Sequence, residues 1–193
     1  MEIIIMPEIV LICEDFAKKS IESSRSHWLK RGVVSESKML SDIVTGKLGE
    51  FAAHKFLVYM DIMAESPDTE IYESKRKSFN SDLSFEGLNF HCKTQSLESQ
   101  QKYGSSWILQ YGGNGHGHTD KLFRAQSEND YLIPMTVNKS TVKIHGIISI
   151  PLLFANNMIK LPKCDWFKDT KRAIYLEDIT KLTYDQRWSL NVK

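Results

Sequence analysis

The segment SDLSFEGLNFHCKTQ, residues 81–95, constrains the fold more than any other part of the sequence. Its side chains alternate with a period of two, which is typical of β-strands because successive residues of a strand point to opposite faces. Glu86 and Gly87 divide the segment and predict the turn of a β-hairpin. The second half then has one largely apolar face and one polar face, made of Leu88, Phe90, Cys92 and Thr94 and of Asn89, His91, Lys93 and Gln95, respectively.

The rest of the chain predicts helices before the hairpin and strands after it. An apolar stripe predicts a helix over residues 7–30, and Ser41 and Asp42 offer a cap for a second helix over residues 41–60. We expect the segments after the hairpin to be a polar linker over residues 96–105, strands over residues 106–111, 130–137 and 141–150, and a short helix or turn over residues 151–154. This order predicts an α/β or α+β fold in one domain.

Composition limits the classes of function. With 193 residues the chain can form one domain with a substantial core. Its net charge of +1 gives no evidence for a nucleic-acid partner, so that evidence has to come from local basic patches. The three cysteines are widely spaced, which is typical of a reducing compartment. Since no stretch resembles a membrane span or a signal peptide, we expect a cytoplasmic protein with no membrane partner.

The polar face of the hairpin carries residue types that suit phosphodiester hydrolysis. Asp82 lies on the same polar side as Lys93, and His91 is two residues from Lys93 on one strand. A carboxylate can hold a hard divalent cation, and an ammonium can offset the charge that develops when water attacks a phosphate. A neutral imidazole can bind a metal or relay a proton. The alternative is a half-exposed hairpin whose polar residues only meet solvent.

Two glycines precede Glu50 in the second helix. Gly46 and Gly49 each cost a helix interior about 1 kcal/mol relative to alanine, and such a cost usually reflects a close backbone approach or a functional need. Glu50 is next to the apolar Phe51, so we expect the Glu50 side chain to point partly toward the protein interior. The alternative is an ordinary surface glutamate that pairs with His54 one turn later.

These motifs, taken in order, resemble a known family. The helix motif GKLGE with Glu50, then Asp82, and then HCKTQ over residues 91–95 are similar to the PD-(D/E)xK nuclease superfamily, which has the restriction-endonuclease-like fold. In that family a helix Glu precedes a strand Asp, and the next strand carries (D/E)xK, often extended to (D/E)xKxQ. The resemblance covers roughly residues 46–110, and the set is similar to small phage or bacterial proteins of the superfamily.

The resemblance implies an architecture, a cofactor and a partner. It implies a restriction-endonuclease-like core with a mixed central sheet of about five strands flanked by helices. The single domain, residues 1–193, would have N-terminal helices over residues 1–60, a core sheet over residues 70–150 and a C-terminal extension over residues 151–193. The implied cofactor is Mg²⁺ or Mn²⁺, and the implied partner is double-stranded DNA, cut by a homodimer in the cytoplasm of a bacterial or phage-infected cell.

The resemblance also implies the roles of five catalytic residues. Asp82 would be the principal metal ligand, and Glu50 would hold the metal or its water from the helix. Lys93 would position the attacking water, and Gln95 would orient Lys93 or a water. His91 stands where the family usually has Asp or Glu. It would bind the metal and favour Mn²⁺ over Mg²⁺, act as a general base, or leave the site inactive.

Further candidates for DNA contact lie outside the hairpin. They are Lys75, Arg76, Lys77, His116, His118, Lys168, Lys171 and Arg172. The basic residues would neutralise phosphates, and the alternative is a solvated surface. The two histidines lie in a glycine-rich loop and could contact DNA or bind zinc, although no CxxC pair supports a zinc site. Trp166 and Phe167 could stack on bases, but packing against the domain is the interpretation we favour.

We therefore expect a divalent-metal-dependent DNA endonuclease. The joint presence of Glu50, Asp82 and Lys93, together with Gln95, favours this enzyme. The rival from another class is an inactive nuclease-fold module that binds nucleic acid or a protein partner, and His91 favours it. A zinc-dependent regulator that uses the histidine loop is a second rival.

Overall fold

The structure, a computed structural model, describes residues 1–30, 35–72, 81–112, 119–120, 123, 128–188 and 190, with the backbone alone for residues 24–30. Its helices are α1 (Pro7–Lys30), α2 (Glu36–Tyr59), α3 (Leu97–Tyr103), α4 (Ile150–Ala155), α5 (Leu176–Ile179) and α6 (Tyr184–Arg187), and Asp165–Phe167 form the 3₁₀ turn η2. Its strands are β1 (Glu2–Ile4), β2 (Leu83–Phe85), β3 (Leu88–Ser96), β4 (Ser106–Gln110), β5 (Asp130–Asn138), β6 (Thr141–Ile144), β7 (Ile148–Ser149) and β8 (Lys171–Tyr175).

The central sheet has the strand order β1-β6-β5-β3-β2, and β7 also pairs with β5. The β3–β5 pair is parallel, whereas the other pairs of this sheet are antiparallel. A parallel pair needs a crossover connection, and the long segment between β3 and β5 supplies it. The predicted α+β class with a mixed sheet of about five strands is therefore confirmed.

The predicted hairpin is confirmed. Leu83 pairs with Phe90, and β2 runs antiparallel to β3. Glu86 and Gly87 form the turn with φ angles of 46° and 84°. A two-residue turn with both φ angles positive matches the twist of the flanking strands, and glycine adopts such an angle at little cost.

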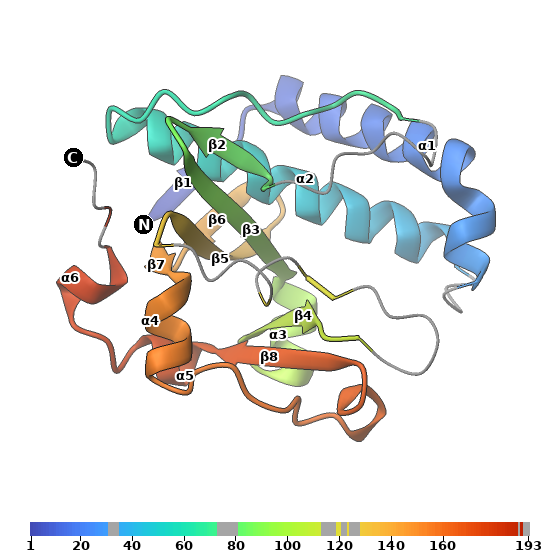
Figure 1. Cartoon of the computed structure of the whole chain (residues 1–193). Helices are drawn as coiled ribbons and strands as arrows, with labels where there is room; N and C mark the ends of the chain where they lie inside the picture. Colours follow the sequence, from blue (N-terminus) through green and yellow to red (C-terminus); the bar gives the residue numbers. More distant parts are fainter. Residues whose placement is uncertain are drawn as a thin grey trace.

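In Figure 1, α1 and α2 lie on one side of the sheet and β4, β8 and α4 on the other. The two apolar clusters of the core lie on these two sides. On one face, Phe90 of β3 packs in a core cluster with residues of α2, such as Phe56 and Leu57. On the other face, Leu132 of β5 packs with residues of β4, β7, β8 and α4. Because His91 is opposite Leu132 in the parallel register, the polar side chains of β3 face this second layer.

The predicted start of the second helix is wrong. α2 begins at Glu36, and the Ser35 side chain caps it by accepting a hydrogen bond from the Lys38 backbone N–H at 3.3 Å. The expected cap at Ser41 and Asp42 lies inside the helix, where Asp42 forms an ion pair with Lys38. Ser35 is as good a cap as Ser41, so local preference alone did not fix the boundary.

The predicted polar linker over residues 96–105 is also wrong, because residues Leu97–Tyr103 form α3. The Ser96 hydroxyl accepts a hydrogen bond from Ser99 N–H at 3.1 Å and caps the helix. Gly104, with φ of 78°, ends it. This helix is polar and none of its residues is buried, so the hydrophobic pattern of the sequence did not indicate a helix.

The second half of the chain holds two more differences. The expected strand over residues 141–150 is interrupted between β6 and β7, where the Ile147 N–H instead donates to the Arg187 carbonyl at 2.8 Å. The C-terminal extension contributes β8, which pairs with β4 in a separate antiparallel sheet. The short apolar helix predicted after residue 150 is confirmed as α4.

The two glycines of α2 have different surroundings. A Cβ built on Gly49 would lie 1.9 Å from the Thr94 hydroxyl oxygen, whereas a Cβ on Gly46 would meet no atom within 4 Å. Gly49 therefore allows α2 to approach β3 closely, as expected from its cost to the helix. Gly46 has no such packing reason.

We predict opposite stability effects for alanine at these two positions. Gly49→Ala should lower the free energy of unfolding by about 1–3 kcal/mol because it overpacks the α2–β3 contact. Gly46→Ala should raise it by up to about 1 kcal/mol through helix propensity. Urea unfolding followed by circular dichroism measures both. Equal effects of the two substitutions would contradict the close approach at Gly49.

His145 is a buried histidine between the sheet and β4. Its Nε2 lies 2.9 Å from Thr136 Oγ1, and its ring lies 5.1 Å from the Trp107 ring. Burial, together with the positive charges of Lys143, the N-terminus and Arg187, lowers the pKa of His145 from 6.5 to about 4. The folded protein therefore holds this imidazole neutral near pH 5.

We predict that acid removes part of the stability through His145. Between pH 6.5 and 4 the unfolded chain binds a proton on this side chain that the folded chain excludes, so stability falls as the pH falls, by up to about 3 kcal/mol. The stability is fully present above pH 6.5. Unfolding titrations at pH 7, 5 and 4 on the protein and on His145→Gln measure the effect. The difference between the two proteins should change with pH, and a constant difference would refute the assignment.

Candidate nucleic-acid and metal site

Glu50 lies on α2, on the side of the sheet that carries Phe90 and Cys92. Its carboxylate forms an ion pair with Lys47 Nζ at 2.5 Å, and Lys47 also donates to the Asp68 carbonyl at 2.7 Å. Both side chains are largely buried, with 19% and 9% of their surface exposed. Glu50 thus points partly toward the interior, as expected, and it pairs with Lys47.

Asp82 binds the backbone of β3 at the edge that β2 leaves unpaired. Its carboxylate oxygen Oδ2 accepts a hydrogen bond from the Cys92 backbone N–H at 2.7 Å, just beyond the last residue that β2 pairs. Burial, followed by the negative charges of Asp82 and Glu50, raises the pKa of the Cys92 thiol well above its ordinary value. Two of the predicted metal ligands therefore approach the same residue of β3, Cys92.

His91 faces the second layer and pairs with a carboxylate that the sequence did not single out. Its Nε2 lies 3.4 Å from Asp130 Oδ1, and Asp130 is the first residue of β5. Both side chains are largely buried. Because the register places Asn89 beside Asp130, His91 reaches this carboxylate diagonally across the parallel pair.

Lys93 points to the same face and pairs with a second unforeseen carboxylate. Its Nζ lies 3.3 Å from Asp120 Oδ2, which also accepts a hydrogen bond from the Gln110 N–H at 2.8 Å. About a quarter of the Lys93 side chain is exposed, 27%, so the ammonium can still be reached from solvent. Asp120 therefore ties Lys93 of the central sheet to the end of β4.

Gln95 holds two neighbouring elements together. Its amide nitrogen donates to the Gly104 carbonyl at 2.9 Å, and its amide oxygen accepts from the Ser106 N–H at 3.1 Å. These contacts fix the end of α3 and the start of β4, and they engage both polar ends of the side chain. The geometry gives Gln95 a structural task, distinct from the expected contact with Lys93.

The predicted metal ligands are not assembled into one site. Within the described residues, no group of three or more His, Cys, Asp or Glu side chains is arranged to hold a metal ion. Glu50 and His91 lie on opposite sides of the β3–β5 pair. Glu50 pairs with Lys47, and His91 pairs with Asp130. Mg²⁺ usually binds through one or two carboxylates together with waters and substrate phosphates, and Asp82 is the exposed carboxylate of the predicted set. The metal stays a prediction.

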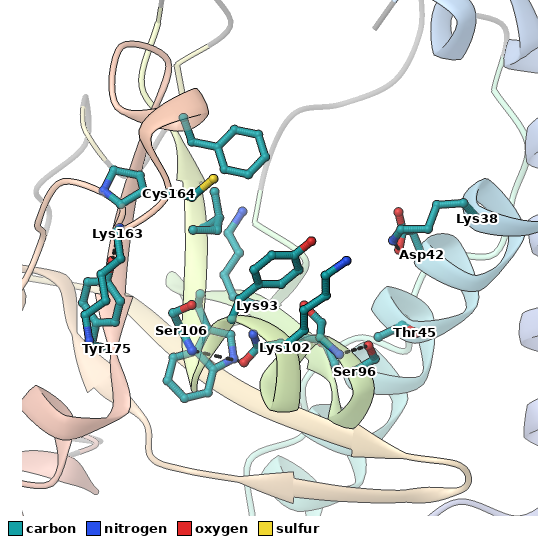
Figure 2. Close-up of a pocket in the computed structure, with 18 residues that line it drawn as sticks. Lys38, Asp42, Thr45, Lys93, Ser96, Lys102, Ser106, Lys163, Cys164 and Tyr175 are labelled. Atoms are coloured by element: carbon teal, nitrogen blue, oxygen red, sulfur yellow. Dashed lines mark hydrogen bonds and ion pairs between the residues drawn. The ribbon is translucent and has the colours of Figure 1, made fainter. Parts of the chain in front are cut away.

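A cavity of about 560 Å³ opens beside Lys93. Its walls come from α2, β3, α3, β4, β8 and the segment around η2. In Figure 2, Lys93 and Lys102 stand in its middle, with Lys38 and Asp42 on one side and Lys163, Cys164 and Tyr175 on the other. Four lysines and one aspartate are among the lining residues. Lysines therefore outnumber carboxylates in the lining, and Lys38, Lys93 and Lys163 each pair with a carboxylate.

The other predicted DNA contacts fall into three groups. Lys75, Arg76, Lys77, His116 and His118 lie outside the described residues. Lys168 forms an ion pair with Asp165, whereas Lys171 lies over the Phe167 ring and Arg172 over the Tyr111 ring. The expectation that Trp166 packs against the domain is wrong, because 90% of its surface is exposed.

Comparisons with known proteins supply no further assignment. No protein-family model, curated protein or solved structure matches this chain. In the described part of the chain, the helices are too short or too polar to cross a membrane.

We predict that Gln95 contributes mainly to stability. Gln95→Leu leaves the Gly104 carbonyl and the Ser106 N–H without their partner, which should lower the free energy of unfolding by about 2–4 kcal/mol. Gln101→Leu, at an exposed position of α3, is the matched control and should change stability by less than about 0.5 kcal/mol. Thermal and urea unfolding give the comparison. Unchanged stability of Gln95→Leu would contradict this role.

Proposed function

We propose that the protein is a divalent-metal-dependent endonuclease that hydrolyses phosphodiester bonds of DNA. The observation that carries the proposal is the position of Lys93, whose partly exposed side chain lines a lysine-rich cavity between α2, β3, α3 and β4. An anionic chain is the ligand that such a cavity attracts. The restriction-endonuclease-like core is part of this proposal.

The order of elements supports the same assignment. Glu50 lies on a helix that packs on the sheet, Asp82 lies at the start of the hairpin, and Lys93 follows on β3. This is the order that the PD-(D/E)xK resemblance requires. The mixed sheet and the parallel β3–β5 pair agree with a core of this kind.

On this proposal the chain's own residues have defined tasks. Lys93 binds a phosphate oxygen and offsets the charge that develops when water attacks phosphorus. Asp120, which is hydrogen-bonded to the end of β4, holds the ammonium in place. His91, paired with Asp130, can accept a proton from the attacking water. A bound Mg²⁺ or Mn²⁺ would supply Lewis acidity, and the exposed Asp82 is its predicted ligand.

A specific observation favours a second candidate, a nuclease-fold module that binds nucleic acid without cutting it. Glu50 is engaged with Lys47, and Asp82 with the Cys92 N–H. Both carboxylates thus have structural partners, and the family's acidic residue is His91 here. The same cavity would then hold the phosphate backbone without hydrolysing it.

We predict that purified protein cuts supercoiled and linear duplex DNA with Mg²⁺ or Mn²⁺ and that EDTA abolishes the cuts. Lys93→Ala should slow cleavage by about 100-fold or more because it removes a charge from the transition state. Asp82→Asn should do the same. It is the sharper variant, since its amide oxygen can still accept the Cys92 N–H. Lys18→Ala, at an exposed position of α1, is the control that should leave cleavage unchanged.

The outcomes separate the two candidates. Metal-dependent cuts that disappear in both site variants support the nuclease. Salt-sensitive DNA binding with no cuts in any metal supports the binding module. Cuts that persist at full rate in Lys93→Ala and Asp82→Asn would show that the activity lies elsewhere.

A further inference from the structure

Two aromatic rings of the cavity are open to solvent. Tyr103, the last residue of α3, is 57% exposed, and Phe167 of η2 is 42% exposed. They come from elements that are far apart in the sequence and line one cavity. Lys102 Nζ lies 5.1 Å from the centre of the Tyr103 ring, and Lys171 Nζ lies 5.7 Å from that of Phe167. Each of these two rings therefore has an ammonium group over one of its faces.

The other two rings of the cavity are already engaged. Trp107 is buried and donates its indole N–H to the Met135 carbonyl at 2.8 Å. The Tyr175 hydroxyl accepts from the Lys163 N–H at 2.8 Å and donates to the Leu161 carbonyl at 3.3 Å. These rings form the walls of the cavity, whereas Tyr103 and Phe167 keep exposed ring surface that is accessible to a ligand.

Two lysines of the cavity, Lys38 and Lys163, can exchange their present partners for phosphate. Lys38 pairs with Asp42, and Lys163 pairs with Glu177, in ion pairs whose side chains are about half exposed or more. Exposed pairs of this kind contribute only about 0–1 kcal/mol, so a phosphate can replace the carboxylate at little cost. A hydrogen bond to Tyr103 raises the pKa of Lys102 above its ordinary value, which keeps this amine charged.

The combination selects one kind of nucleic acid. Open aromatic rings beside lysines are the features by which proteins bind single strands, because every unpaired base offers a face for stacking. In an intact duplex the base faces are covered by their neighbours, so the rings could not reach them. The cavity volume of about 560 Å³ lies within the range of small-ligand pockets and accommodates a nucleotide.

We propose that this cavity binds an unpaired nucleotide, with its base against Tyr103 and Phe167 and its phosphates at Lys93, Lys102 and Lys163. On this assignment the protein prefers single-stranded DNA, and duplexes that contain unpaired nucleotides, over intact duplex DNA. This assignment rests on the proposed nucleic-acid function and narrows its substrate. Trp166, which is 90% exposed and adjacent to Phe167, is placed to stack on the next base.

The test is a binding measurement in EDTA, so that its result does not depend on cleavage. Fluorescence anisotropy with a labelled 20-nucleotide oligothymidine and with a blunt 20-base-pair duplex gives the two affinities. We expect the single strand to bind at least about tenfold more tightly. Tyr103→Ala should weaken single-strand binding about 5- to 100-fold, since stacking of one base contributes about 1–3 kcal/mol, and should leave duplex binding unchanged.

Two control variants test whether the effect is specific to the Tyr103 ring. Tyr103→Phe keeps the ring and should retain single-strand binding. Tyr59→Ala removes a ring that is 77% exposed at the end of α2, away from the cavity, and should have no effect. Circular dichroism confirms that each variant is folded, as expected for changes at exposed positions.

Three outcomes would overturn the proposal: equal or tighter binding of the duplex, unchanged single-strand binding in Tyr103→Ala, or no binding of either probe. Failure of the nuclease gives a different pattern. Single-strand binding that depends on Tyr103, with no cleavage in any metal, would retain the cavity assignment and reject the endonuclease. Cleavage that does not depend on Tyr103 would retain the endonuclease and reject the cavity assignment.

Discussion

The pairing of β3 with its neighbouring strands determines where the candidate site lies. β3 pairs with β5 over residues 89–96, whereas β2 pairs only with residues 88–90. The rest of its outer edge would expose backbone groups that must find other partners. Asp82 accepts the N–H of Cys92, and β4 starts where Gln95 binds Ser106. The lysine-lined cavity lies beside this end of β3, where no strand within the described residues pairs with the outer edge beyond Phe90.

The same strand separates the predicted site into two halves. Period-two geometry sends Cys92 toward α2 and Glu50, and His91 and Lys93 toward β4. Asp82 lies at the edge between them. On our proposal the phosphate-binding half is the one with Lys93, and its charge is balanced by Asp120. Glu50 and Lys47 form a buried ion pair in the other half, where removing either partner would leave an uncompensated charge.

Local patterns predicted the hairpin and the close approach of α2, because both depend on neighbouring residues. Glu86 and Gly87 specify the turn, and the cost of Gly49 in a helix indicates a contact. The partners of the polar face could not be predicted in this way. Asp120 lies 27 residues from Lys93, and Asp130 lies 39 residues from His91, so the β3–β5 crossover brings them together. A carboxylate at the start of the apolar run DYLIP was the available signal for Asp130.

The central claim is that Lys93 lies in a phosphate-binding site, and the salt dependence of DNA binding tests it most directly. The affinity of the protein and of Lys93→Ala for one oligonucleotide is measured in EDTA over a series of salt concentrations, with Lys18→Ala as the control. Loss of one phosphate contact should make the slope of log K against log salt shallower by about 0.7–0.9. The control should keep the original slope. An unchanged slope in Lys93→Ala would mean that this lysine does not contact phosphate, and the proposed site would be wrong.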